Sequence, residues 1–217
     1  MNGREHASSG SAHSERGLER LVFFSDAVVA IAITLIALPL VDSARDVRDS
    51  GASKFLADNT YALTAAGISF VIISAFWRDH HRLFERATGY TPLLIRVNML
   101  WLLAMVAIPV TTVLDVYTRR NDRLAIGIYI GVIVFAMVIA RVEELLLYRS
   151  GLLTNRADLT PADLASHRIT VAAAVLALVI AVALPHVGMW SLLILVVTGP
   201  LPGAARRRWG TRGTEAS

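Results

Sequence analysis

The chain has 217 residues, of which 55% are hydrophobic and only 18% are charged, whereas a soluble domain keeps about a quarter of its residues charged. The apolar residues form long blocks separated by short charged stretches, which is typical of membrane spans. The absence of cysteine excludes disulfides, thiolate catalysis and cysteine-ligated metal clusters. The net charge is +4, and nearly all of the basic residues are arginines. In a membrane protein this basic excess indicates topology and contact with lipid headgroups rather than nucleic-acid binding.

The two ends of the chain differ in composition from its middle. Residues 1–18 are rich in serine, glycine and charged side chains, and predict a disordered tail. Residues 204–217 predict a second, basic tail. Residues 19–203 between them predict a transmembrane domain, whose first apolar block is too long and too far into the chain for a signal peptide.

Six apolar blocks predict six transmembrane helices, because a helix rises about 1.5 Å per residue and about 20 residues cross the hydrocarbon. The blocks cover residues 21–41, 59–77 (at most to 84), 92–117, 124–147, 161–184 and 187–201. Thr-Pro pairs at 91–92 and 160–161 each predict a helix start with a threonine N-cap. Asn121 or Asp122 is expected to cap the fourth helix, and Pro39 falls in the last turn of the first.

Arginine and lysine counts predict the orientation in the membrane. With the N-terminus inside, the inside segments and adjoining helix ends hold fifteen of the 21 basic residues, and the outside loops hold six. This excess follows the positive-inside rule, so both termini are expected in the cytoplasm. The chain has no internal sequence repeat, so any pseudosymmetry must come from oligomerisation.

An aspartate lies about a turn and a half into the first predicted span, where a charged side chain needs a partner or water. With 3.6 residues per turn, Ala27, Ile31, Thr34 and Leu38 share one stripe of this helix, and Asp26 lies well round from the stripe. We therefore expect Asp26 to face neighbouring helices of its own subunit, and the stripe to face something else.

Three motifs follow one another along residues 19–120. Residues 20–26 read Arg, three apolar residues, then Phe-Ser-Asp; residues 77–84 contain Trp and a His-His pair; Asn98 and Pro109 follow in the third span. Together they resemble the transmembrane-protein-175 family of lysosomal and bacterial potassium channels, although Arg78-Asp79 is more charged than that pattern. The resemblance implies a structural network holding the first helix against the second and third, made by Arg20, Phe24, Ser25, Asp26, Trp77, His80, His81 and Asn98.

The resemblance also implies a fold and a function: an all-α subunit with six transmembrane helices, in a homotetramer whose pore is lined by the first helix. It implies a bacterial plasma-membrane channel with modest preference for potassium over sodium, without the Thr-Val-Gly-Tyr-Gly carbonyl filter, which this sequence lacks. By position, Ile31 matches the apolar constriction and Thr34 a pore-lining threonine linked to selectivity. Leu38 would form a second apolar ring, and Ala27 completes the stripe.

The implied interaction partners are identical subunits, membrane lipid and monovalent cations, with potassium as the permeant ion and no cofactor. Asp26 is either a structural contact or a group that senses protons or touches ions. The pair His80-His81 is a structural contact of the first helix, a pH sensor, or a metal site. Adjacent helix positions point different ways, which disfavours the metal site.

A secondary or proton-coupled transporter is the main alternative function. It would use Asp26 and His80/His81 as a relay, but no inverted repeat supports it. A non-conducting scaffold is a third interpretation. The sequence contains no His-Glu-x-x-His, Gly-x-Ser-x-Gly or phosphate-binding glycine loop, so no catalytic or metal-binding residue is expected. Glu143 and Glu144 are expected to form a solvated helix end with Arg141.

Overall fold

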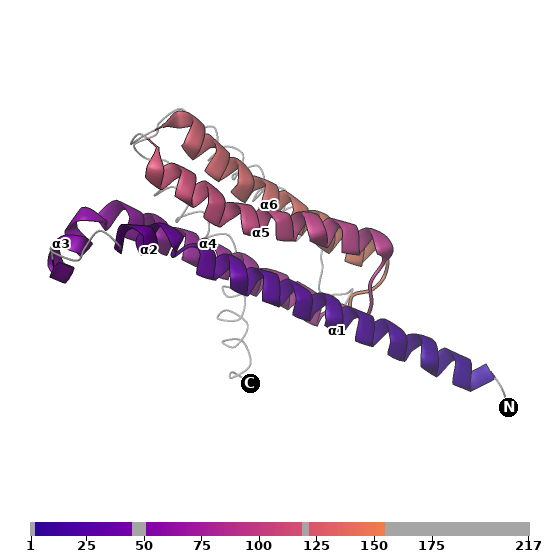
Figure 1. Ribbon diagram of the computed structural model, residues 1–217. Coiled ribbons are helices and arrows are strands. Elements are labelled where there is room, and N and C mark those ends of the chain that lie inside the picture. Colours follow the sequence, from indigo (N-terminus) through magenta and orange to yellow (C-terminus); the bar gives the residue numbers. More distant parts are fainter. Residues whose placement is uncertain (1–2, 45–50, 119–121, 155–217) are drawn as a thin grey trace, which may run out of the picture.

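The computed structural model describes residues 3–44, 51–118 and 122–154, so the fifth and sixth predicted spans and the C-terminal tail lie outside the described residues. Its described elements are helices (Figure 1), with the bounds α1 Gly3–Leu35, α2 Leu38–Ala44, α3 Gly51–Asp58, α4 Thr60–Glu85, α5 Pro92–Tyr117 and α6 Arg123–Arg149. Four stretches are long and apolar enough to cross a membrane: Glu15–Val41, Thr60–Glu85, Pro92–Tyr117 and Arg123–Arg149. The first four predicted spans are therefore confirmed as apolar helices of spanning length.

The first helix begins earlier than the apolar block that defines its span. Composition predicts a disordered tail over residues 1–18, but α1 already starts at Gly3, and its first turns project beyond the bundle (Figure 1). A helix adds one hydrogen bond for each residue that it extends, once the costly first turn exists. The apolar span supplies that first turn, so the polar residues before it continue the helix.

Proline ends α1 before the predicted span is complete. Pro39 has no N–H for the carbonyl of Leu35, and its ring opposes the helical path. The amides of Ile36 and Ala37 instead bond to carbonyls three residues back, at 3.3 and 3.2 Å, and α2 then begins at Leu38. The first span is thus interrupted about three-quarters of the way along, between the predicted positions Thr34 and Leu38.

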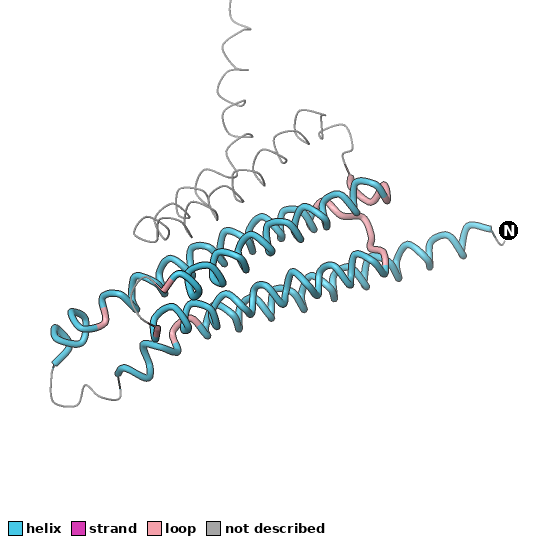
Figure 2. The backbone as a smooth tube through the Cα atoms, turned by 90° about the horizontal axis from the view of Figure 1, so that it is seen from above, coloured by secondary structure: helices cyan, strands magenta, loops and turns pink. Residues whose placement is uncertain are grey.

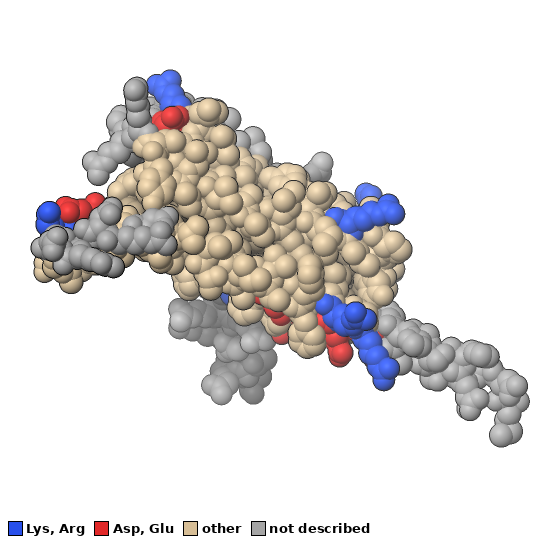
Figure 3. Space-filling view, in the orientation of Figure 1, with Lys and Arg blue, Asp and Glu red and all other residues tan. Residues whose placement is uncertain are grey.

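The spanning helices form a bundle centred on α5, which packs against α1, α4 and α6. The chain passes back and forth along the bundle, with α2 and α3 at the end opposite the N-terminus (Figures 1 and 2). One end therefore collects the middle of α1, the end of α4, the start of α5 and the end of α6. We call it the arginine-rich end, because it carries Arg16, Arg20, Arg82, Arg86, Arg96 and Arg149. Between the two ends, the face shown in Figure 3 has few charged side chains.

Side-chain caps fix where two helices begin. Thr91 accepts a hydrogen bond from the Leu94 amide at 3.1 Å, with Pro92 as the first residue of α5, which confirms the predicted start. Asp122 caps α6 by accepting from the Leu124 amide at 2.8 Å. Each cap satisfies an amide that the helix itself leaves free.

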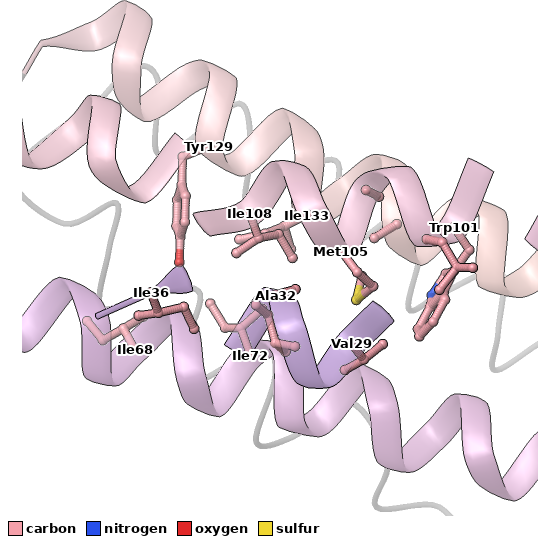
Figure 4. Packing of buried hydrophobic residues seen from close by; sticks show 14 of the residues in the cluster. Val29, Ala32, Ile36, Ile68, Ile72, Trp101, Met105, Ile108, Tyr129 and Ile133 are labelled. Carbon is pink, nitrogen blue, oxygen red and sulfur yellow. The ribbon is translucent and has the colours of Figure 1, made fainter. Parts of the chain in front are cut away.

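Two apolar clusters hold the bundle together. The larger joins α1, α4, α5 and α6 through buried side chains that include Val29, Ile72, Met105, Ile108 and Ile133 (Figure 4). The smaller lies at the arginine-rich end and contains Leu18, Leu21, Phe84, Leu94 and Leu147. Beside it, the α4–α5 loop pairs with the segment after α6 through an isolated bridge between residues 87 and 153. The part of α1 around Leu18 and Leu21 is therefore held by a packed, hydrogen-bonded end of the bundle.

Gly17 is a close-approach position in α1. A Cβ added there would lie 2.5 Å from Cε1 of Tyr90, in the α4–α5 loop. Replacing a helical glycine by alanine normally gains about 1 kcal/mol, whereas overpacking costs about 1–3 kcal/mol.

We therefore expect Gly17→Ala to lower the melting temperature of the purified protein. The same substitution in a Tyr90→Ala background should raise it, because the obstructing ring is gone. Equal effects of Gly17→Ala in both backgrounds would contradict the close approach.

Candidate functional site

The stripe singled out in the sequence lies on the free side of the first span. Ile31 is 59% and Leu38 50% exposed, and Ala27 and Thr34 are also exposed. We call these four residues the outer stripe. The opposite side of α1 is buried in the bundle, through Leu21, Ser25, Val29, Ala32 and Ile36. The outer stripe is therefore free to contact something beyond the described residues of this subunit.

Thr34 brings a polar group to this apolar stripe. Its hydroxyl donates a hydrogen bond to the Ile31 carbonyl at 2.7 Å. Because the hydroxyl hydrogen is donated to this backbone carbonyl, the lone pairs of the hydroxyl oxygen point away from the carbonyl. An exposed threonine in this state presents an oxygen acceptor, which is the kind of ligand that suits a hard cation.

A buried hydrogen-bond chain joins α1, α5 and α4. Asn98 Nδ2 donates to Ser25 Oγ at 2.9 Å, and Ser25 Oγ donates to the Leu21 carbonyl at 2.9 Å. Asn98 Oδ1 lies 2.9 Å from His80 Nε2. Since Oδ1 can only accept, the His80 Nε2 must carry the hydrogen. We call Ser25, His80 and Asn98 the buried network; it fixes the inner side of α1 to its neighbours.

Aromatic rings and a carboxyl group complete the surroundings of His80. The imidazole is stacked between Phe84 and Trp101, with ring centroids 4.4 and 3.9 Å away. On α6, Glu143 Oε2 lies 3.9 Å from His80 Nε2, with the two side chains 0% and 2% exposed. That distance is too long for a hydrogen bond, and the two groups attract each other as an ion pair only when the imidazole is protonated and the carboxyl group is ionised.

The buried position of Glu143 shows that its prediction as part of a solvated helix end is wrong. Because α6 continues to Arg149, Glu143 lies inside the helix, on the same face as the buried Ala136 and Leu147. The neighbouring Glu144, which the sequence predicts to contact Arg141 or Tyr148, forms a partly buried ion pair in which its Oε2 lies 2.8 Å from Arg141 Nη1.

Asp26 has a separate contact at the edge of the bundle. Its Oδ1 accepts a hydrogen bond from Trp77 Nε1 at 2.8 Å. Trp77 also stacks on His81, with centroids 5.4 Å apart, and His81 Nε2 lies 3.3 Å from Glu85 Oε1. The two histidines therefore have different surroundings, one buried and one half-exposed.

The predicted network thus divides into parts. Ser25, His80 and Asn98 form the buried network, and Asp26, Trp77 and His81 form the edge contacts. Two other predicted members, Arg20 and Phe24, are exposed, and within the described ranges Arg20 makes no ion pair with Asp26. Asp26 and His80 do not share one hydrogen-bond chain among the described residues.

A second polar cluster lies farther from the arginine-rich end, and sequence reasoning missed it. Ser69 Oγ lies 2.8 Å from Thr112 Oγ1 and 3.0 Å from the Tyr129 hydroxyl. A further hydrogen bond joins α4 and α5, because the Tyr61 hydroxyl donates to Asp115 Oδ2 at 2.6 Å. Polar residues inside apolar blocks were the available signal, because interhelical hydrogen bonds are how membrane helices satisfy them. In the described ranges, no group of three His, Asp or Glu side chains is placed to hold a metal ion.

Comparison with known proteins adds an independent line of evidence. The family model described as endosomal/lysosomal potassium channel TMEM175 matches residues 20–109, which include all three motifs. A potassium channel of Streptomyces collinus is 31% identical over 124 residues, 56% of this chain and 59% of that protein. A potassium channel of Chamaesiphon minutus is 30% identical over 149 residues, 67% of this chain and 72% of that protein.

The fold is shared with a solved structure. The crystal structure of a lysosomal potassium-selective channel TMEM175 homologue from Chamaesiphon minutus matches with a TM-score of 0.62 at 23% identity, covering 83% of this chain and 93% of that chain. The apolar helices and the family match together make this a multi-pass membrane protein. The chain belongs to the TMEM175 family.

Proposed function

We propose that this chain is one subunit of a homotetrameric cation channel that conducts potassium in preference to sodium. Six transmembrane helices per subunit, with both termini in the cytoplasm, would place the arginine-rich end inside a bacterial plasma membrane. The outer stripe of each subunit would face a shared central axis. The observation that carries the proposal is the exposure of Ile31, Thr34 and Leu38 on a span whose other side is packed.

The packing of the first span leaves its outer side available for a contact beyond the described residues. Only 22% of its most apolar stretch is buried, the lowest value among the four spans, against 50% in α5. Contact with lipid would be enough to explain an exposed apolar surface. It would not explain why that surface also carries a threonine and a small alanine. The relatives named as potassium channels make a pore the better explanation.

A ring of isoleucines provides the proposed constriction. Four Ile31 side chains around an axis offer no polar group in place of hydration water, so a narrow ring dewets and stops ions. A slightly wider ring admits partly hydrated ions. Leu38, which follows the break at Ile36 and Ala37, would form a second apolar ring, and Ala27 a wider passage on the other side of Ile31.

Thr34 provides the proposed source of selectivity. Four threonine oxygens just beyond the isoleucine ring would contact an ion as it loses part of its water. Potassium is larger and more weakly hydrated than sodium, so it loses that water at lower cost. A modest preference for potassium follows without any carbonyl filter.

The buried network and the edge contact at Asp26 would then have a structural role. They tie the inner side of α1 to α4 and α5 at the arginine-rich end. A rigidly held inner side fixes the rotation of α1, and the rotation decides which residues face the axis.

The proposed function is tested by reversal potentials of the purified protein in planar bilayers, with potassium on one side and sodium on the other. We expect a reversal potential that indicates preference for potassium, and a shift toward zero for Thr34→Val, which keeps the shape but removes the hydroxyl. Thr64→Val, which alters a threonine on α4, is the matched control and should behave as wild type. Absence of current, or equal permeability of the two ions in the wild type, would contradict the proposal.

A further inference from the structure

Glu143 places a carboxyl group within the packed bundle. Its side chain is 0% exposed, and neither carboxyl oxygen has a hydrogen-bond partner among the described residues. An ionised carboxylate in that condition is strongly unfavourable, because it has lost its water without gaining donors. The neutral, protonated acid avoids most of this penalty.

The polar and charged groups around the His80 imidazole come from the described helices α1, α4, α5 and α6. They are Asp26 from α1, His81 from α4 itself, Asn98 and Trp101 from α5, and Glu143 from α6. Asp26 is engaged by Trp77 and His81 is paired with Glu85. Asp26 therefore already has a hydrogen-bond partner, whereas Glu143 has none among the described residues. The Oε2 of Glu143 lies 3.9 Å from His80 Nε2.

The direction of hydrogen bonding makes His80 sensitive to the charge on Glu143. Its single Nε2–H is already donated to Asn98 Oδ1 at 2.9 Å, and Glu143 Oε2 lies 3.9 Å from the same nitrogen. A negative charge at that oxygen would compete with the neutral amide for this hydrogen, since charged acceptors form the stronger bonds. A protonated Glu143 would leave the hydrogen with Asn98.

We propose that Glu143 is a proton-binding residue whose proton controls the hydrogen bond between His80 and Asn98, and through Ser25 the position of α1. When the acid ionises, its O–H bond breaks, the proton leaves to water and the electron pair stays on the carboxylate. The carboxylate then draws the His80 N–H away from Asn98 and loosens the anchor of α1. The effect on flux rests on the proposed channel function; the buried proton does not.

Infrared difference spectroscopy tests the proton directly. We expect the wild type at neutral pH to show the carbonyl band of a protonated carboxylic acid that fades as the pH is raised, and Glu143→Gln to lack it. Glu144→Gln, which alters the neighbouring carboxylate paired with Arg141, is the matched control and should retain the band. A band that is absent from the wild type, or unchanged in Glu143→Gln, overturns the assignment.

Potassium flux into proteoliposomes tests the consequence for α1. We expect wild-type flux to change between weakly acid and weakly alkaline buffer, and this change to be lost in Glu143→Gln, which keeps the neutral form at every pH. Glu144→Gln should follow the wild type. If Glu143→Gln also follows the wild type, Glu143 does not regulate conduction. If the wild type carries no flux at all, the proposed function fails, and the infrared result still decides whether Glu143 holds a proton.

Discussion

Ile31→Ala is expected to raise potassium flux about tenfold and to reduce the preference for potassium over sodium. Four shortened side chains would widen the proposed ring and let it stay wet, so ions would pass with more of their water. A barrier lowered by about 1.4 kcal/mol corresponds to about a tenfold rate. Ion flux and bi-ionic reversal potentials in proteoliposomes measure both effects.

Leu103→Ala is the matched control for this substitution. Leu103 is 61% exposed on α5, close to the 59% of Ile31, but it lies outside the outer stripe. Its truncation should leave flux and selectivity unchanged. Similar changes in the two variants would mean a general loosening of the bundle and would contradict a constriction at Ile31.

Asn98→Leu is expected to have the largest effect on stability among single substitutions in the buried network. It removes both hydrogen bonds of the amide and leaves the buried His80 N–H without its acceptor. An unsatisfied buried group costs about 1–3 kcal/mol, although interhelical hydrogen bonds in membranes average nearer 0.6 kcal/mol. We therefore expect a destabilisation of about 1–3 kcal/mol, seen as a lower melting temperature in detergent.

A double-mutant cycle separates the network from simple loss of packing. Ser25→Ala removes the hydroxyl that accepts from Asn98, so Asn98→Leu should cost less in that background than in the wild type. Met99→Leu alters the next residue, which is exposed, and should be close to neutral. Full additivity of the two network substitutions would show that Ser25 and Asn98 are not coupled.

The features that are predictable from the sequence follow from helix periodicity and membrane energetics. Asp26 and the stripe of Ile31 separate on a helical wheel, and the structure places the stripe on the free side and gives Asp26 a contact within the subunit. The pair Thr91-Pro92 predicts the start of α5, because few residues other than proline fit the first helical position so well. Such local rules require no knowledge of neighbouring helices.

The features that were missed depend on which helices become neighbours. Nothing local to Glu143 shows whether it faces water or His80, because that depends on the face that α6 turns to α4. The Ser69, Thr112 and Tyr129 contacts likewise join residues from three helices. Pro39 indicates that the first span is interrupted, but only the observed hydrogen bonds show that the interruption lies at Ile36 and Ala37, before Leu38.

The central claim is that Ile31 faces an ion pathway, and a single introduced cysteine tests it most directly because the natural sequence contains none. A positively charged, membrane-impermeant thiol reagent is applied to the Ile31→Cys variant during potassium flux, with Leu103→Cys as the matched position. We expect the reagent to block flux through Ile31→Cys and to leave flux through Leu103→Cys unaffected. Labelling of the Ile31→Cys variant without loss of flux, or equal block of both variants, would place Ile31 outside the ion pathway.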